Sequence, residues 1–318
     1  MQKLDLEKVK STLKETDFPI KVVAEVVYGC NLNCIMCPLD KITRKPYGGE
    51  ATGLRGAMDI KLFEKICREI GEKGQEVGTK LWIPLMGELF MIGEKAIDYI
   101  AIAKKFNVPE VIFNTNGTLL NEKLIDKVLE VQPDEIYFGI DGATQEAYNK
   151  IRRGGDFEKV KRNILYMLKR KKELGLKKPK IHVQFIVMNE NRHEEQIFKE
   201  FWLKEGAIVK IRRKLGWGSA LKADDLVLSQ SDRNMPCPWL IRTFIVHQNG
   251  MVPQCDSDHD GKYYAGNLNE ENTTIEKIWL GELKNRRMKH WNNDFNNPLC
   301  RTCNDWQCGL SEFHQPTE

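Results

Sequence analysis

The sequence predicts an α/β protein: a partial (β/α)6 barrel followed by a small C-terminal α+β domain. Three observations support this prediction. Six β-rich segments alternate with amphipathic helical segments between residues 21 and 215, which is the pattern of a parallel sheet with right-handed crossovers. Residues 216–236 are rich in Gly, Ser and Asp, as linkers are. Eight of the nine cysteines form two groups near the two ends of the chain.

The expected elements follow the spacing of the apolar residues. Residues 1–20 hold a short amphipathic helix (5–15), and a buried strand follows at 21–28. The other barrel strands are expected at residues 80–85, 110–114, 135–140, 180–187 and 208–214. The helices between them are expected at residues 60–70, 94–105, 122–131, 144–151, 157–174 and 194–204. Functional groups are then expected in the loops that follow the carboxyl ends of the strands.

Residues 237–318 have a different character. Two short strands (243–248 and 251–254) are expected around a turn at Asn249-Gly250, followed by helices at 274–280 and 283–291. Five of the cysteines fall in this short region. Because its core is small for its length, a bound metal centre is the natural source of its stability.

Composition excludes several classes of protein. Of the 318 residues, 41% are hydrophobic and 30% are charged, so the chain is globular and not wholly disordered. The sequence has neither an apolar run of about 20 residues nor the apolar core of a signal peptide, so a cytoplasmic location is expected. A net charge of +4 gives no reason to expect nucleic acid or a membrane as partner.

The first cysteine group has the spacing Cys30-x-x-x-Cys34-x-x-Cys37 and directly follows the first strand. Thiolates are soft ligands that suit iron–sulfur clusters and zinc. A structural zinc ion would need a fourth Cys or His nearby, and none follows closely. Three thiolates on a four-iron cluster leave one iron free to bind another ligand. A [4Fe–4S] cluster is therefore the favoured interpretation.

This spacing, placed after the first strand, resembles the signature of the radical S-adenosylmethionine (SAM) superfamily. The resemblance implies a TIM-like partial barrel and a [4Fe–4S] cluster held by Cys30, Cys34 and Cys37, whose open iron binds SAM. It also implies reductive cleavage of SAM to a 5′-deoxyadenosyl radical that takes a hydrogen atom from the substrate. A flavodoxin- or ferredoxin-type electron donor is expected on the same ground. Met36 stands where the family often has an aromatic residue.

Short motifs after later strands also resemble the family. Pro84-Leu-Met-Gly-Glu resembles its Gly-Gly-Glu motif, with Met86 in place of the first glycine; the carboxylate of Glu88 would accept from the SAM ammonium. Asp141 is expected near a ribose hydroxyl, and Arg152 or Arg153 near the SAM carboxylate. The SAM contacts that the resemblance implies are Gly87, Glu88, Asn114, Asn116, Asp141, Arg152 and Met188.

The second cysteine group consists of Cys237-x12-Gly250-x4-Cys255, then Cys300-x-x-Cys303, and finally Cys308. On its own it is also compatible with a zinc ribbon. Behind the barrel it resembles the SPASM/Twitch extension, including the stretches Gly266-Asn-Leu and Ile278-Trp279.

Five cysteines cannot fully ligate two four-iron clusters. The resemblance therefore implies one auxiliary [4Fe–4S] cluster on Cys237, Cys255, Cys300 and Cys303, with a spacing similar to that of 2-deoxy-scyllo-inosamine dehydrogenases.

Two further residues are candidates for the reaction itself. Cys308 is left over, and it is either a hydrogen-atom donor, as in radical epimerases, or a plain buried cysteine. Arg213 lies with Arg212 and Trp217 after the sixth strand and is a candidate substrate contact. Cys67, on an apolar helix face, is expected in the core.

The predicted reaction is dehydrogenation or epimerisation at a secondary alcohol carbon of a small carbohydrate, aminocyclitol or nucleoside-like substrate. A ketyl radical left by hydrogen-atom removal can give its electron to an auxiliary cluster, which favours oxidation. Two alternatives stay open: a peptide maturase that forms thioether or carbon cross-links or epimerises a residue, and a zinc-bearing binding protein without catalysis.

Overall fold

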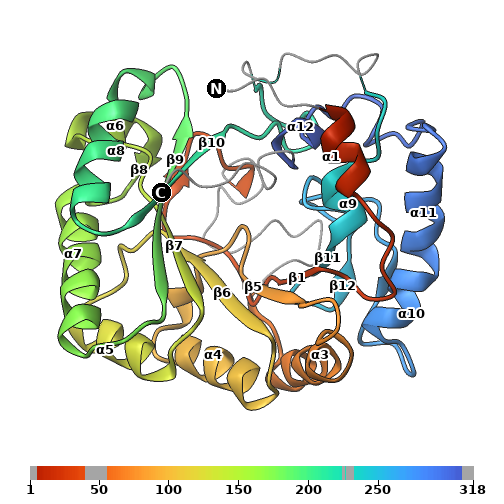
Figure 1. The fold of residues 1–318 in the computed structure, drawn as a ribbon, viewed down its shortest axis with the longest axis horizontal. Coiled ribbons are helices and arrows are strands. Elements are labelled where there is room, and N and C mark those ends of the chain that lie inside the picture. Colours follow the sequence, from red (N-terminus) through yellow and green to blue (C-terminus); the bar gives the residue numbers. More distant parts are fainter. Residues whose placement is uncertain (1–5, 40–55, 224–225, 227–232, 310–318) are drawn as a thin grey trace.

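The computed structural model describes residues 6–39, 56–223, 226 and 233–309. Its centre is a seven-stranded parallel sheet with the strand order β10-β9-β7-β6-β5-β1-β11. The sheet curves into an incomplete barrel with helices along its outer side (Figure 1). The α/β class and the parallel partial barrel predicted from the sequence are confirmed. Within the described ranges, no helix combines the length and apolarity needed to span a bilayer.

The strands form where β-branched and aromatic residues are frequent. They are β1 (Lys21–Ala24), β5 (Lys80–Ile83), β6 (Glu110–Thr115), β7 (Glu135–Gly139), β9 (Lys180–Val187), β10 (Ile208–Arg213) and β11 (Thr243–Val246). One side of each strand packs against the helices, as Leu81, Phe113 and Phe185 do. The opposite side carries the polar residues and faces the lumen, because successive side chains of a strand point in opposite directions.

Four of the six crossover helices begin at capping residues that the sequence makes recognisable. The six helices are α3 (Ile60–Lys73), α4 (Lys95–Lys105), α5 (Glu122–Val131), α6 (Gln145–Ile151), α7 (Phe157–Glu173) and α8 (Glu195–Lys204). The side chains of Asp59, Asn121, Thr144 and Asp156 each accept a hydrogen bond from a backbone N–H of the first turn, which stabilises the helix start.

The strand at 243–246 corrects one expectation. It does not pair with the strand after it in a separate hairpin, but lies parallel to β1 as the seventh strand of the barrel sheet. The turn itself is present, since the backbone N–H of His247 donates to Met251 O at 2.8 Å. Strand β12 (Met251–Val252) then pairs with β13 (Gly266–Asn267). All four residues of β11 are buried although it is the last strand of the sheet, as suits a parallel sheet that is covered on both faces.

The C-terminal helices pack beside this edge of the barrel (Figure 1). They are α9 (Pro238–Arg242), α10 (Ile275–Leu280), α11 (Glu282–Trp291) and α12 (Trp306–Gly309). Helix α1 (Leu6–Thr12) belongs to the same cluster, because Val9 packs with Ile241 and Trp306 in one apolar group. Helix α1 and the C-terminal helices therefore share a core.

Candidate functional site

The first three cysteines lie together at the carboxyl end of the sheet. Cys34 is in the short strand β3 (Asn33–Cys34), which pairs with β8 (Arg152–Arg153). All three thiols are free of disulfides. Burial, together with the neighbouring Glu88 and Cys34, raises the pKa of Cys30 to about 12. Thiolates in such a place need a positively charged partner, which the irons of a cluster would supply, so the donor set fits a cluster.

The loop after β5 holds the Glu88 carboxylate close to this group. Position 87 of this loop must be a glycine, because a Cβ there would stand 1.6 Å from the carbonyl oxygen of Val27. The Glu88 carboxylate is 2% exposed and accepts from Asn116 N at 2.6 Å and from Thr115 Oγ1 at 2.8 Å. Burial raises the pKa of Glu88, while these hydrogen bonds oppose the increase. The carboxylate is thus held in one orientation, as a contact to a cationic ligand group requires.

The two asparagines that end β6 have different surroundings. Asn116 donates to Asn31 Oδ1 at 2.9 Å and lies 3.6 Å from Cys30 Sγ, so it orients the cysteine loop. Asn114 donates to Pro84 O at 3.3 Å. Its Oδ1 atom is buried without a hydrogen-bond partner among the described residues, which leaves an acceptor available to a ligand.

Asp141 and Arg152 form a buried ion pair on the Cys34 side of the loop. Arg152 donates to Asp141 Oδ2 from Nε at 2.8 Å and from Nη2 at 2.6 Å. Asp141 Oδ1 accepts from Ile186 N at 2.6 Å. Asp141 therefore holds Arg152 in place, and its contact to a ribose hydroxyl stays a prediction. Met188 packs with Cys34 in a small apolar cluster.

Four of the five C-terminal cysteines lie around one cavity, and the fifth lies elsewhere. Cys237, Cys255, Cys300 and Cys303 line a single cavity, together with Trp239 and Gln254. None of the four is in a disulfide. In the part of the chain that the structure describes, no three Cys, His, Asp or Glu side chains converge on a single-ion site. A four-iron cluster gives each thiolate its own iron, so ligands placed around a cavity fit its chemistry.

Cys308 does not line that cavity. It packs with Leu226 and Trp239 in an apolar cluster, and its thiol donates to Lys214 O at 3.9 Å. Burial, together with the neighbouring Asp305, raises the pKa of Cys308 to about 12. Cys67 is fully buried on α3, as the sequence predicts.

Aromatic and polar side chains of β5, β7, β9 and β10 face the inside of the barrel. Tyr137 lies between Trp82 and His182, with ring centroids 4.9 Å and 4.1 Å apart. Nearer the carboxyl ends of the strands, Arg212 donates to Gln184 Oε1 at 3.1 Å. The alternation of side chains puts Arg213 on the opposite side of β10, the side of Val209 and Ile211. Arg212 is thus better placed than Arg213 to contact a substrate in the lumen.

The lumen and the four-cysteine cavity share a wall. Lys21 Nζ lies 5.4 Å from the ring centroid of Trp82 in the lumen and 5.0 Å from that of Trp239. Trp239 also lines the cysteine cavity. Asp256, which follows Cys255, lies 3.9 Å from Lys21 Nζ. Lys21, Trp239 and Asp256 therefore form a wall between the cysteine cavity and the lumen.

Two buried acidic residues were not singled out from the sequence. Glu25 is 1% exposed and accepts from the backbone N–H groups of Leu85 and Met86 at 2.8 and 2.9 Å. It anchors the loop that carries Glu88. The sequence feature that could have identified it is its position as a single acidic residue within an apolar run. Asp305 accepts from Gly216 N and Gly218 N at 2.6 and 2.8 Å.

Trp217 lies between these two glycines. Its indole N–H donates to Met36 O at 2.9 Å in the first cysteine loop. The loop that carries Trp217 therefore bridges the two cysteine groups, because Asp305 lies two residues after Cys303.

Comparison with known proteins agrees with this geometry. Residues 237–304 match SPASM, an iron–sulfur cluster-binding domain. A tungsten-containing aldehyde ferredoxin oxidoreductase cofactor-modifying protein from Pyrococcus furiosus is 29% identical over 171 residues, 52% of this chain and 43% of the relative. Mycofactocin maturase MftC from Mycolicibacterium smegmatis is 23% identical over 227 residues, 71% of this chain and 52% of the relative. The chain spans about half the length of the curated relatives it matches.

Solved structures show the same fold. BtrN in complex with AdoMet and 2-DOIA is 17% identical, with a TM-score of 0.60 over 92% of this chain and 94% of that one. SuiB from Streptococcus suis, bound to S-adenosylmethionine, is 13% identical, with a TM-score of 0.64 over 89% and 70%. Residues 24–201 match the Radical SAM superfamily. The chain therefore belongs to the radical SAM superfamily and carries a SPASM-type iron–sulfur domain.

Proposed function

We propose that this radical SAM enzyme oxidises a secondary alcohol carbon of a small polar substrate, of the carbohydrate, aminocyclitol or nucleoside-like class. The observation that carries the proposal is the wall between the lumen and the four-cysteine cavity, formed by Lys21 and Trp239. In this proposal, an electron released in the lumen would cross this wall to reach an acceptor in the cavity. The likeness to BtrN, whose complex contains 2-DOIA, is consistent with it.

The two iron–sulfur clusters and SAM would each be held by residues described above. Cys30, Cys34 and Cys37 would bind the first cluster, and Cys237, Cys255, Cys300 and Cys303 the auxiliary one. When bound, the first cluster and SAM supply a 5′-deoxyadenosyl radical that removes a hydrogen atom from the substrate. The residues expected to hold SAM are Gly87, Glu88, Asn114, Asn116, Asp141, Arg152 and Met188.

The chain's own residues would bind the substrate and take up its proton. The Trp82–Tyr137–His182 rings would form one side of the substrate site, and Arg212 would offer guanidinium donors to hydroxyl oxygens. Oxidation of the alcohol carbon also releases one proton. Asp256, at the shared wall, is the proton acceptor that we propose.

Anaerobic reconstitution tests the proposal. The parent is expected to bind about eight irons per chain, and the double variant Cys255→Ala/Cys300→Ala about four. The double variant should still release 5′-deoxyadenosine in a reductant-dependent reaction but form no oxidised product. Cys67→Ala, in the core, is the matched control and should keep the full iron content. Stoichiometric zinc without SAM cleavage would instead support the zinc-binding alternative.

A peptide maturase is the second candidate, because the mycofactocin maturase MftC is 23% identical over 71% of the chain. The same assay separates the two when it is run with a panel of polyols and a panel of peptides in deuterated water. A ketone without solvent deuterium supports dehydrogenation. Incorporation of solvent deuterium at the reacting carbon by the parent, but not by Cys308→Ala, would show epimerisation with Cys308 as the hydrogen donor.

A further inference from the structure

Gln254 makes a direct contact with one of the auxiliary cysteines. It lies between β12 and Cys255, and it is 2% exposed. Its Nε2 atom donates to Cys300 Sγ at 3.0 Å. A buried amide that faces a thiol sulfur at this distance makes a specific hydrogen bond.

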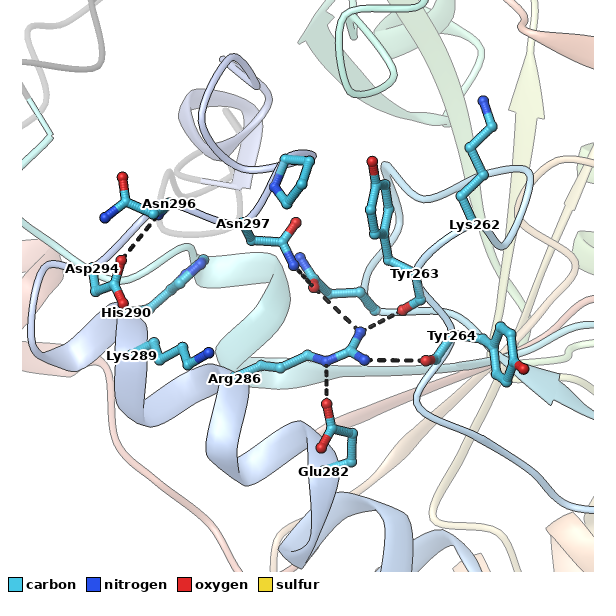
Figure 2. Close-up of a pocket in the computed structure, with 12 residues that line it drawn as sticks. Lys262, Tyr263, Tyr264, Glu282, Arg286, Lys289, His290, Asp294, Asn296 and Asn297 are labelled. Atoms are coloured by element: carbon cyan, nitrogen blue, oxygen red, sulfur yellow. Dashed lines mark hydrogen bonds and ion pairs between the residues drawn. The ribbon is translucent and has the colours of Figure 1, made fainter.

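The surroundings of Gln254 fix which end of the amide faces the sulfur. Its Oε1 atom accepts from Asn297 Nδ2 at 2.9 Å and from Arg286 Nη1 at 3.3 Å. Both partners are donors only at these atoms, so the oxygen must face them and the NH2 group must face Cys300. Arg286 is itself held by Glu282 at 2.9 Å and by the carbonyl oxygen of Tyr264 at 3.1 Å (Figure 2).

Gln254 also lies between the four-cysteine cavity and a second pocket. Its side chain lines both the four-cysteine cavity and a pocket of about 520 Å³ on the C-terminal side, which Arg286, Lys289 and Asn297 also line (Figure 2). The amide therefore stands between Cys300 and the pocket. Hydrogen bonds to cluster sulfurs and exposure to solvent are two of the factors that set a cluster's reduction potential.

We propose that Gln254 is a positioning residue that raises the reduction potential of the auxiliary cluster through its hydrogen bond to Cys300. The inference rests on the proposed function, which makes Cys300 a cluster ligand. One electron converts [4Fe–4S]2+ to [4Fe–4S]+ and adds negative charge that the sulfurs share. The N–H dipole of Gln254 stabilises that extra charge, so the cluster accepts an electron from a substrate radical more readily.

The test compares potentials in a chain that retains only the auxiliary site. In a Cys30→Ala/Cys34→Ala/Cys37→Ala background, Gln254→Glu keeps the side-chain shape and the acceptor for Arg286 and Asn297, but it places an oxygen against the sulfur. A potentiometric titration followed by electron paramagnetic resonance should show a more negative midpoint than the background. Lys289→Gln, in the pocket wall but without a bond to Gln254, is the matched control and should leave the midpoint unchanged.

A second variant guards against loss of the cluster in Gln254→Glu. Asn297→Ala removes one donor from the amide oxygen, so a smaller shift in the same direction is expected. Unchanged midpoints in the iron-loaded variants would overturn the inference while leaving the proposed function intact. Failure of the triple-alanine background to bind about four irons would overturn the proposed ligand set, and the inference with it.

Discussion

Glu25 is a carboxylic acid in an otherwise apolar environment at the end of β1. Burial raises its pKa from 4.5 to about 7, although three backbone N–H groups oppose the shift. Its native pKa lies above its unfolded value, so the native state binds the proton more tightly. The free energy of unfolding should therefore fall as the pH rises from about 4.5 to about 7 and level off above it.

Glu25→Gln should remove that dependence, because glutamine keeps an oxygen for Leu85 N and Met86 N but cannot ionise. Relative to the parent, the variant is expected to gain about 2 kcal/mol in unfolding free energy between pH 5.5 and pH 8. Anaerobic urea denaturation at the two pH values measures this. Glu72→Gln, on the exposed surface of α3, should keep the parental slope, and an equally steep slope in Glu25→Gln would contradict the expectation.

The other residue-scale features differ in how far the sequence could reveal them. The cysteines were predicted because thiols in short, fixed spacings are rare without a ligand. Gln254 could not be singled out, since a glutamine in a loop gives no sign of its partner. Its importance comes from Arg286 and Cys300, which lie 32 and 46 residues away in the sequence.

At the scale of elements, the pairing of β3 with β8 links the cysteine loop to the segment after α6. Cys34 is in register with Arg152, and Arg152 lies over Gly139, where a Cβ would stand 2.1 Å from Nη2. Asp141 then fixes the guanidinium. These two short strands were not predicted, because two-residue strands leave no periodicity to read.

Asp141→Asn should destabilise this junction. The side chain of Arg152 is 13% exposed, and a buried charge that loses its partner costs about 3 kcal/mol or more. The expected result is a lower unfolding free energy and weaker SAM binding, measured by denaturation and by equilibrium dialysis. Glu146→Gln breaks the exposed Glu146–Lys150 pair on the neighbouring helix and should change neither quantity. Equal stability of the two variants would count against the role of Asp141.

At the scale of the whole molecule, the C-terminal region is attached to the barrel by polar contacts as well as apolar ones. Glu69 on α3 accepts from Ile275 N and Glu276 N at 2.8 and 2.9 Å, and so caps α10 from another part of the chain. Arg287, which is fully buried, pairs with Glu15 at 2.8 Å. The cysteine cavity is therefore held at a set position beside the lumen.

Glu69→Ala should loosen this attachment, because two backbone donors at the start of α10 lose their acceptor. A missing cap of this kind costs about 1–2 kcal/mol. The expected result is a lower melting temperature and faster hydrogen exchange in residues 275–291, with iron bound at the first site unchanged. Glu72→Ala, exposed on the same helix, is the control. Unchanged exchange in residues 275–291 would show that apolar packing alone holds the region.

The sequence by itself determined the parallel α/β class, the order of strands and helices, and the two cysteine groups. These are local properties, expressed in apolar spacing, capping residues and short motifs. Only the tertiary structure decided that β11 joins the barrel, that Asp141 serves Arg152, and that Lys21 and Trp239 form the wall between lumen and cavity. Each of these depends on which distant segments meet, and that follows from the packing of the whole chain, which no single stretch of residues encodes.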